Sequence, residues 1–139
     1  MQIVTLKWHG PYNFSLIENR DIAYEYGIYS IYQIFGGREN LLYIGKTTRD
    51  FMTRLNEHLY WMNKVRGTLK IRLGVILLED GQRFSRKRLS DVESLLITWH
   101  SPPENTTNAI YYYGRENLTI LNIGRRGHIA PRVSTDDLQ

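Results

Sequence analysis

The sequence contains no cysteine, no internal repeat and no apolar run of membrane-spanning length. Without cysteine, a disulfide framework and a thiolate metal site are both excluded. Residues 1–8 lack the basic segment and the apolar segment of a secretory signal peptide, and no stretch approaches the roughly 20 apolar residues of a transmembrane helix. We therefore expect a cytoplasmic protein with no membrane partner.

The composition is that of an ordinary globular chain, with 42% hydrophobic and 23% charged residues among 139. This length is sufficient for one domain with its own core, and no low-complexity linker divides the chain. We expect a single domain spanning residues 1–139. The net charge of +4 and the isoelectric point near 9.4 permit a polyanionic partner but do not require one.

Alternating apolar residues between turn signals predict the strands of a small sheet. The pattern gives residues 3–8, 27–34, 41–46, 70–78, 110–113 and 119–123. We expect residues 3–8 to form an edge strand that ends at a Gly10-Pro11 turn. Residues 27–34 and 41–46 are expected to pair as a hairpin, with residues 70–78 as a third strand.

Two segments show helical spacing of apolar residues instead. Residues 51–62 are predicted to form one helix, with Asp50 as its N-cap. Residues 90–99 are predicted to form a second helix, which ends before Pro102-Pro103. The fold class is therefore α+β, with a small antiparallel β-sheet that has a three-stranded core and is flanked by helices.

Several polar side chains are not required for this fold. Arg54 and His58 are four residues apart, so they share a helix face that is not the apolar one. Lys46 lies where a strand ends, and Tyr29 is held within a strand, which fixes its position. Cationic and phenolic donors of this kind suit a phosphodiester. Glu93, near the start of the second helix, adds a carboxylate that could hold a metal ion.

These residues lie in a pattern that resembles the GIY-YIG nuclease superfamily. The "GIY" element occupies residues 27–29 and the "YIG" element occupies residues 43–45. Further residues keep the order and spacing of the family, namely Lys46, Arg54, His58, Glu93 and Asn105. The resemblance covers about residues 27–108 as a motif core, with residues 1–26 and 110–139 as family-specific extensions. The separation between the two tyrosines is longer than is usual in the family.

The resemblance implies a metal-dependent DNA endonuclease of the restriction, repair or mobile-element type, acting on double-stranded DNA. Glu93 would bind Mg²⁺ or Mn²⁺, hard cations that prefer oxygen ligands. Arg54 would contact a phosphate oxygen. Tyr29 would accept or relay the proton of the attacking water, with Tyr43 as the alternative base. Lys46 and the metal would lower the pKa of that base.

The remaining motif residues have less defined roles. His58 would be a second base or a phosphate contact, whereas Gly45 and Asn105 would be structural residues near the site. Two other functions stay open, a nucleic-acid-binding module of the same fold that does not cut, and an RNA-directed nuclease. Because a non-cutting module needs neither Glu93 nor both tyrosines, the sequence favours a DNA nuclease.

Some of these residues also have simpler explanations. Ser90 and Glu93 match a Ser-x-x-Glu capping box, in which the glutamate only satisfies the start of a helix. Basic residues outside the motif predict either sequence-independent attraction to nucleic acid or a solvated basic surface. They form two groups, Arg83, Arg86, Lys87 and Arg88 before the second helix, and Arg125, Arg126 and Arg132 in the tail.

Overall fold

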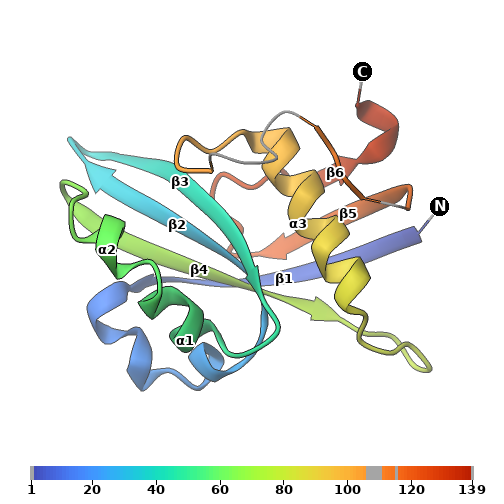
Figure 1. The fold of residues 1–139 in the computed structure, drawn as a ribbon, viewed down its shortest axis with the longest axis horizontal. Helices are drawn as coiled ribbons and strands as arrows, with labels where there is room; N and C mark the ends of the chain where they lie inside the picture. Colours follow the sequence, from blue (N-terminus) through green and yellow to red (C-terminus); the bar gives the residue numbers. More distant parts are fainter. Residues whose placement is uncertain (1, 106–110, 115, 139) are drawn as a thin grey trace.

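The computed structural model describes residues 2–105, 111–114 and 116–138. Within them the chain forms one curled, six-stranded mixed sheet with helices packed on it (Figure 1). The strand order is β3-β2-β4-β1-β5-β6. The strands are β1 Gln2–Asn13, β2 Gly27–Phe35, β3 Arg38–Thr47, β4 Thr68–Leu77, β5 Leu118–Gly124 and β6 Arg132–Ser134. The helices are α1 Phe51–Asn56, α2 Leu59–Met62 and α3 Arg86–His100, with 3-10 turns η1 Phe14–Asn19, η2 Asp21–Tyr24 and η3 Thr135–Asp137.

The α+β class is confirmed, and the antiparallel trio β3-β2-β4 is present as expected. The sheet itself is larger than expected, and it is mixed because β1 runs parallel to β5. The prediction of β1 as an edge strand is wrong, since β1 pairs with β4 on one side and β5 on the other. Alternation reveals that one face of a strand is buried, but it does not identify the strand's neighbours.

The ends of the chain also differ from expectation. Gly10-Pro11 does not end β1, which continues to Asn13 through an irregularity between His9 and Tyr12. Residues 119–123 do form a strand, β5. The strand expected at residues 110–113 is not formed by residues 111–113, where the Tyr113 amide donates to Ser94 Oγ at 2.9 Å, and residue 110 lies outside the described residues. The polar tail contributes β6, which pairs with β5.

The helix boundaries correct two further expectations. Asp50 caps α1 as predicted, accepting a hydrogen bond from the Thr53 amide at 2.7 Å. The helix expected over residues 51–62 is instead two short helices, separated around His58. The N-cap of α3 is Ser85, which accepts from the Arg88 amide at 3.2 Å. Glu93 therefore lies inside the helix, and the capping-box explanation of this residue is wrong.

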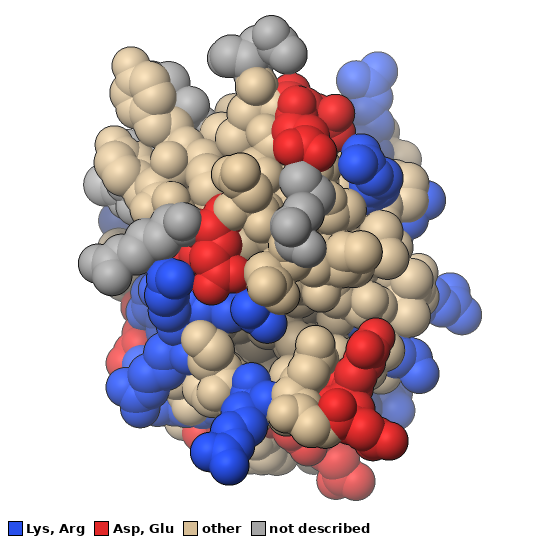
Figure 2. Space-filling model, turned by 90° about the vertical axis from the view of Figure 1, so that its right-hand side faces the viewer, with Lys and Arg blue, Asp and Glu red and all other residues tan. Residues whose placement is uncertain are grey.

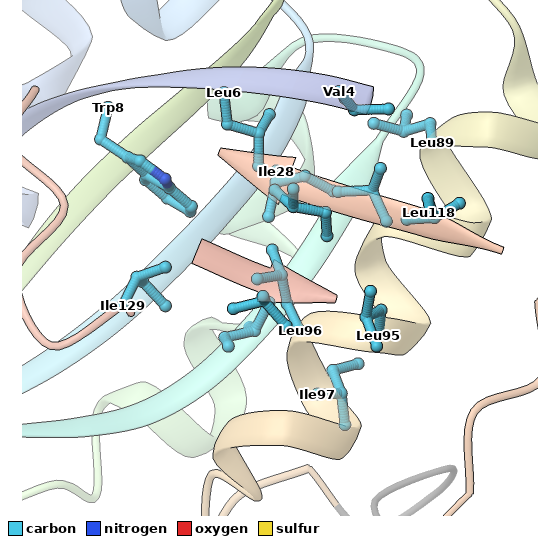
Figure 3. Close-up of a cluster of buried hydrophobic side chains, with 14 residues drawn as sticks. Val4, Leu6, Trp8, Ile28, Leu89, Leu95, Leu96, Ile97, Leu118 and Ile129 are labelled. Atoms are coloured by element: carbon cyan, nitrogen blue, oxygen red, sulfur yellow. The ribbon is translucent and has the colours of Figure 1, made fainter. Parts of the chain in front are cut away.

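Each face of the sheet carries its own core. On one face, side chains of α3 such as Leu89 and Leu96 pack against Val4, Leu6 and Trp8 of β1 (Figure 3). The opposite face holds a second cluster, in which α1, η1 and η2 cover β2 and β4. Burying one large apolar side chain contributes about 1.5–3 kcal/mol, so both sets of helices are firmly fixed to the sheet. The polar motif residues are carried on these fixed elements.

Candidate functional site

Tyr29, from β2, lies at the centre of the polar motif. Its side chain is fully buried, and its hydroxyl lies 2.7 Å from His58 Nε2. Tyr43, from β3, stacks on it with ring centroids 6.1 Å apart. In the β2–β3 ladder Tyr29 is directly opposite Gly45. The two strands therefore bring both motif tyrosines and the motif glycine into one layer.

His58 is more buried than its helical spacing suggested. It is only 5% exposed, and its second ring nitrogen, Nδ1, accepts a hydrogen bond from the Trp61 indole at 3.0 Å. The expectation that His58 is not needed for packing is therefore wrong. The helix is interrupted around this residue, and its side chain packs among the rings of Tyr29, Tyr43 and Trp61.

Glu93 and Lys46 meet at the other end of the site. Glu93 projects from α3, and its Oε1 lies 3.6 Å from Lys46 Nζ at the end of β3. The Glu93 side chain is 22% exposed. Burial raises the pKa of this carboxyl, and the charge of Lys46 opposes that effect. A carboxylate is thus held, partly desolvated, beside a cation.

Two cavities open onto these residues. A cavity of about 250 Å³ is lined by Lys46, Thr47, Thr48, Arg49, Arg54 and Glu93. A second cavity of about 460 Å³ is lined by Tyr43, Arg54, Glu57, His58, Tyr60, Trp61, Glu104 and Asn105. Arg54 lines both cavities, so it connects the Glu93–Lys46 pair with the aromatic group. Five of the six predicted catalytic residues line one of these cavities, and Tyr29 lies buried behind Tyr43.

The two tyrosines are neutral in this arrangement. Burial is the main cause that raises the pKa of Tyr29, and the cation that opposes it is Arg54. Burial also raises the pKa of Tyr43, again opposed by Arg54. We expected Lys46 to be the protein cation that lowers the pKa of Tyr29. In the structure this cation is Arg54. Burial lowers the pKa of His58 to about 4, so this imidazole is neutral at pH 7.

Sequence reasoning missed the residues that hold the motif side chains. Glu57 Oε1 accepts from Arg54 at 3.0 Å and from Arg49 at 2.7 Å, so one carboxylate binds two arginines. Trp61 holds His58, as described above. The signal was present in the sequence, because Glu57 follows Arg54 by three residues and Trp61 follows His58 by three, a spacing that places side chains together in a helix.

Asn105 joins the segment after α3 to the edge strand β3. Its side chain accepts from the Ile44 amide at 2.9 Å and donates to the Ile44 carbonyl at 2.8 Å. Ile44 lies between Tyr43 and Gly45, so this pair of hydrogen bonds fixes the backbone of the "YIG" element. The contact is to backbone alone, which fits a structural role.

The basic residues outside the motif are only partly free. Lys87 and Arg88 both contact Glu116, at 3.2 and 3.4 Å. Arg126 donates to the Ile129 carbonyl at 2.9 Å and holds the tail. Arg83, Arg86 and Arg125 are exposed to solvent. Arg132 is also exposed, but its guanidinium pairs with the Asp137 carboxylate at 2.9 Å. On the face at the right of Figure 1, Figure 2 shows Lys and Arg interspersed with Asp and Glu.

A metal would have to be held by few protein ligands. Among the described residues, no group of three His, Asp or Glu side chains could bind a metal ion. Glu93 nevertheless fits a hard cation such as Mg²⁺, which keeps several waters and takes one or two carboxylates together with substrate phosphate oxygens. The cavity beside Glu93 leaves space for such waters. No helix in the described part of the chain is long and apolar enough to cross a membrane.

Comparison with known proteins agrees with this geometry. The model of the GIY-YIG catalytic domain matches residues 25–108, which is more than half of the chain. The chain belongs to the GIY-YIG family, whose catalytic domain implies nuclease-type activity. No curated protein and no solved structure matches the chain.

Proposed function

We propose that this protein is a divalent-metal-dependent DNA endonuclease that hydrolyses phosphodiester bonds in double-stranded DNA. The observation that carries the proposal is the meeting of Glu93, Lys46 and Arg54 around one cavity, next to the layer of Tyr29, Tyr43 and His58. Burying a carboxylate carries a desolvation cost, which a purely structural glutamate on a helix surface would avoid. The position of Glu93 is instead suited to a cation and a phosphate.

Arg54 is the residue that would hold the scissile phosphate. It lies between the two cavities, and its present partner is the exposed carboxylate of Glu57. Exposed ion pairs are weak, so a phosphate can replace Glu57 at little cost. A guanidinium then offers two parallel donors to the phosphate oxygens. Lys46, which also lines the smaller cavity, adds a second positive charge.

The phenols of Tyr29 and Tyr43 would accept or relay the proton of the attacking water. Tyr43 lines the larger cavity, and Tyr29 lies behind it in a stacked arrangement. Both are neutral before substrate binds, so one phenol proton must first leave to solvent in the cavity that Tyr43 lines before the pair can accept another. Arg54 lowers the pKa of both phenols, which assists that loss. Glu93 would hold a divalent cation, which would supply stabilisation of the charge that develops during hydrolysis.

The nature of the substrate is the finer part of the proposal. The exposed cations Arg83, Arg86 and Arg125 support a polyanion, and their attraction is independent of sequence. The choice of DNA over RNA rests on the resemblance to DNA-cutting branches of the family. We also propose a cytoplasmic site of action. A non-cutting binding module would keep the basic surface without needing Glu93.

A direct cleavage assay tests the proposal. Purified protein is incubated with supercoiled plasmid, single-stranded DNA and RNA, each with Mg²⁺, Mn²⁺ or EDTA. We expect nicking or cutting of the plasmid with either metal and none with EDTA. The same assay with the Glu93→Gln protein should show no cutting. If no substrate is cut with either metal, the binding module is the better description of this chain, and cutting of RNA alone would change the substrate class.

A further inference from the structure

The contacts of His58 determine which of its ring nitrogens carries a proton. Nδ1 lies 3.0 Å from Trp61 Nε1, and Nε2 lies 2.7 Å from the Tyr29 hydroxyl. An indole N–H can only donate a hydrogen bond, so Nδ1 must be the acceptor and cannot carry a proton. In a neutral imidazole the proton then lies on Nε2. His58 is therefore a donor towards Tyr29.

This direction of donation is the opposite of what a general base needs. A base at this position would offer a free lone pair to the Tyr29 hydroxyl, but the lone pair of His58 is already occupied by Trp61. Protonation of His58 at Nδ1 would point its new N–H group at the indole N–H of Trp61, and two donors cannot form a hydrogen bond. The imidazole therefore stays neutral and donates, a state that its burial also favours.

We infer that Trp61 is a positioning residue that holds His58 in its Nε2–H tautomer, so that His58 donates a hydrogen bond to the Tyr29 oxygen and does not act as a base. The catalytic importance of this arrangement rests on the proposed nuclease function, whereas the tautomer itself follows from the hydrogen bonds alone. A fixed donor stabilises Tyr29 most when Tyr29 has lost its proton, because hydrogen bonds to a charged oxygen are about twice as strong as neutral ones.

The surroundings of these hydrogen-bonded side chains support a fixed arrangement. Trp61 is half-buried and its ring packs against Tyr43 and His58, with centroids 5.7 and 5.8 Å apart. His58 is in turn enclosed by Tyr43, at 4.7 Å between centroids. Rings held on several sides do not rotate freely, so the hydrogen-bond direction persists.

The tautomer can be measured without any cleavage assay. Protein labelled with ¹⁵N-histidine gives long-range ¹H–¹⁵N correlations that distinguish a protonated from a bare ring nitrogen. At pH 7 we expect His58 to show a proton on Nε2 and none on Nδ1. Trp61→Phe, which keeps an aromatic ring but loses the N–H, should give a mixture of tautomers. Trp99→Phe is the matched control, since Trp99 lies on α3 and touches none of these residues in the described contacts, and it should leave the His58 signals unchanged.

Cleavage by His58 variants provides the second readout. The amide of His58→Gln can donate a hydrogen bond but cannot accept a proton at neutral pH. We expect this variant to cut within about tenfold of the parent at saturating DNA, and His58→Ala to be slower by about 100-fold or more. Trp61→Phe should lose about tenfold, the equivalent of one hydrogen bond.

The outcomes separate this inference from the function. A proton on Nδ1, or an imidazolium at pH 7, overturns the inference whether or not the protein cuts DNA. A His58→Gln protein as slow as His58→Ala also overturns the inference. Glutamine keeps a hydrogen-bond donor and loses only the base, so equal losses would mean that His58 acts as a base. A parent protein that shows the Nε2–H tautomer and cuts nothing would keep the assignment of Trp61 and His58 and remove the nuclease. A folded Trp61→Phe protein that keeps the pure Nε2–H tautomer overturns the role of Trp61. If this variant does not fold, a proton on Nδ1 of the parent or equal rates of the two His58 variants still overturns the inference.

Discussion

The backbone of Gly45 is packed directly against the phenol of Tyr29 on the neighbouring strand. A Cβ atom at position 45 would overlap both the terminal ring carbon and the hydroxyl of Tyr29. The Tyr29 side chain is fully buried and hydrogen-bonded to His58, so displacing it would disturb that hydrogen bond and the surrounding core. The tyrosine of the "GIY" element can therefore pack in its observed position only because the glycine of the "YIG" element has no side chain.

This packing predicts that Gly45→Ala displaces Tyr29. We expect a loss of about 1–3 kcal/mol in the free energy of unfolding, as is typical of overpacking a core. Cleavage should fall by about 100-fold, because a displacement of about 1 Å at a reacting group has that effect. Urea unfolding and plasmid cleavage measure the two quantities. Normal cleavage by a folded Gly45→Ala protein would show that the position of Tyr29 is not important.

Glu93→Gln tests the carboxylate without disturbing the helix. Because Glu93 is inside α3 and not at its cap, the amide should fit with little change in stability. It lacks the negative charge that a divalent cation needs, so cleavage should be lost while DNA binding persists. The matched control is Ser85→Ala, which removes the true N-cap. That change should cost about 0.5–2 kcal/mol of stability and leave the cleavage rate of the folded protein near the parental value. Equal cleavage by Glu93→Gln and the parent would exclude Glu93 as the metal ligand.

Arg54→Ala should separate chemistry from binding. The variant removes one of several cations that face the DNA backbone, so affinity should change little, but the transition state loses its bidentate cation. We expect cleavage to fall by about 10²–10³-fold, in the range seen when one such electrostatic donor is removed. Arg49→Ala is the control, because Arg49 shares the Glu57 carboxylate but lines only the smaller cavity. Its cleavage rate should fall much less; equal losses in both variants would assign the phosphate contact to the two arginines jointly.

The basic segment at the start of α3 predicts a change in salt dependence. Neutralising Arg86, Lys87 and Arg88 together should weaken DNA binding and make its dependence on salt shallower, by roughly one unit of slope for each phosphate that is no longer neutralised. Glu116→Gln is the opposite change. It removes the carboxylate that forms ion pairs with Lys87 and Arg88 in the free protein, so both cations become available to DNA. It should tighten binding and steepen the slope. Binding titrations at several salt concentrations measure both variants. An unchanged slope in the triple variant would leave this segment as solvated surface.

The pKa of His58 predicts how stability depends on pH. Burial lowers this pKa from about 6.5 to about 4 in the folded state, so the neutral ring is favoured by folding. The corresponding stability is fully present above pH 6.5 and is lost as pH falls through 4. His58→Gln has no such titration. The stability advantage of the parent over this variant should therefore shrink between pH 6.5 and pH 4 in urea unfolding measurements. A difference that is constant over this range would contradict the lowered pKa.

Much of the fold and of the site could be predicted from local patterns. Alternation located β2, β3 and β4, and the expected hairpin of residues 27–34 and 41–46 is the observed pairing of β2 with β3. Asp50 was identified as an N-cap from its position before an apolar helical stripe. The spacing of the motif residues indicated the family and the group of polar side chains, because fixed separations along strands and helices project onto fixed positions in space.

The errors share one physical origin. The middle position of β1, its parallel pairing with β5 and the inclusion of β6 depend on contacts between distant segments, which no local pattern contains. Ser90 and Ser85 are equally good caps by residue type, and the packing of Leu89 in the core decided in favour of the earlier start of α3.

The sequence by itself determined which chemical groups are present, their order, and most of the strands and helices that carry them. The tertiary structure alone decided that Tyr29 is buried behind Tyr43, that Arg54 and not Lys46 is the cation acting on both phenols, and that Trp61 occupies one nitrogen of His58. The reason is that exposure, electrostatic neighbours and hydrogen-bond direction are properties of the packed arrangement. They depend on distances of a few ångströms between segments far apart in the chain, whereas periodicity reports only on neighbours along it.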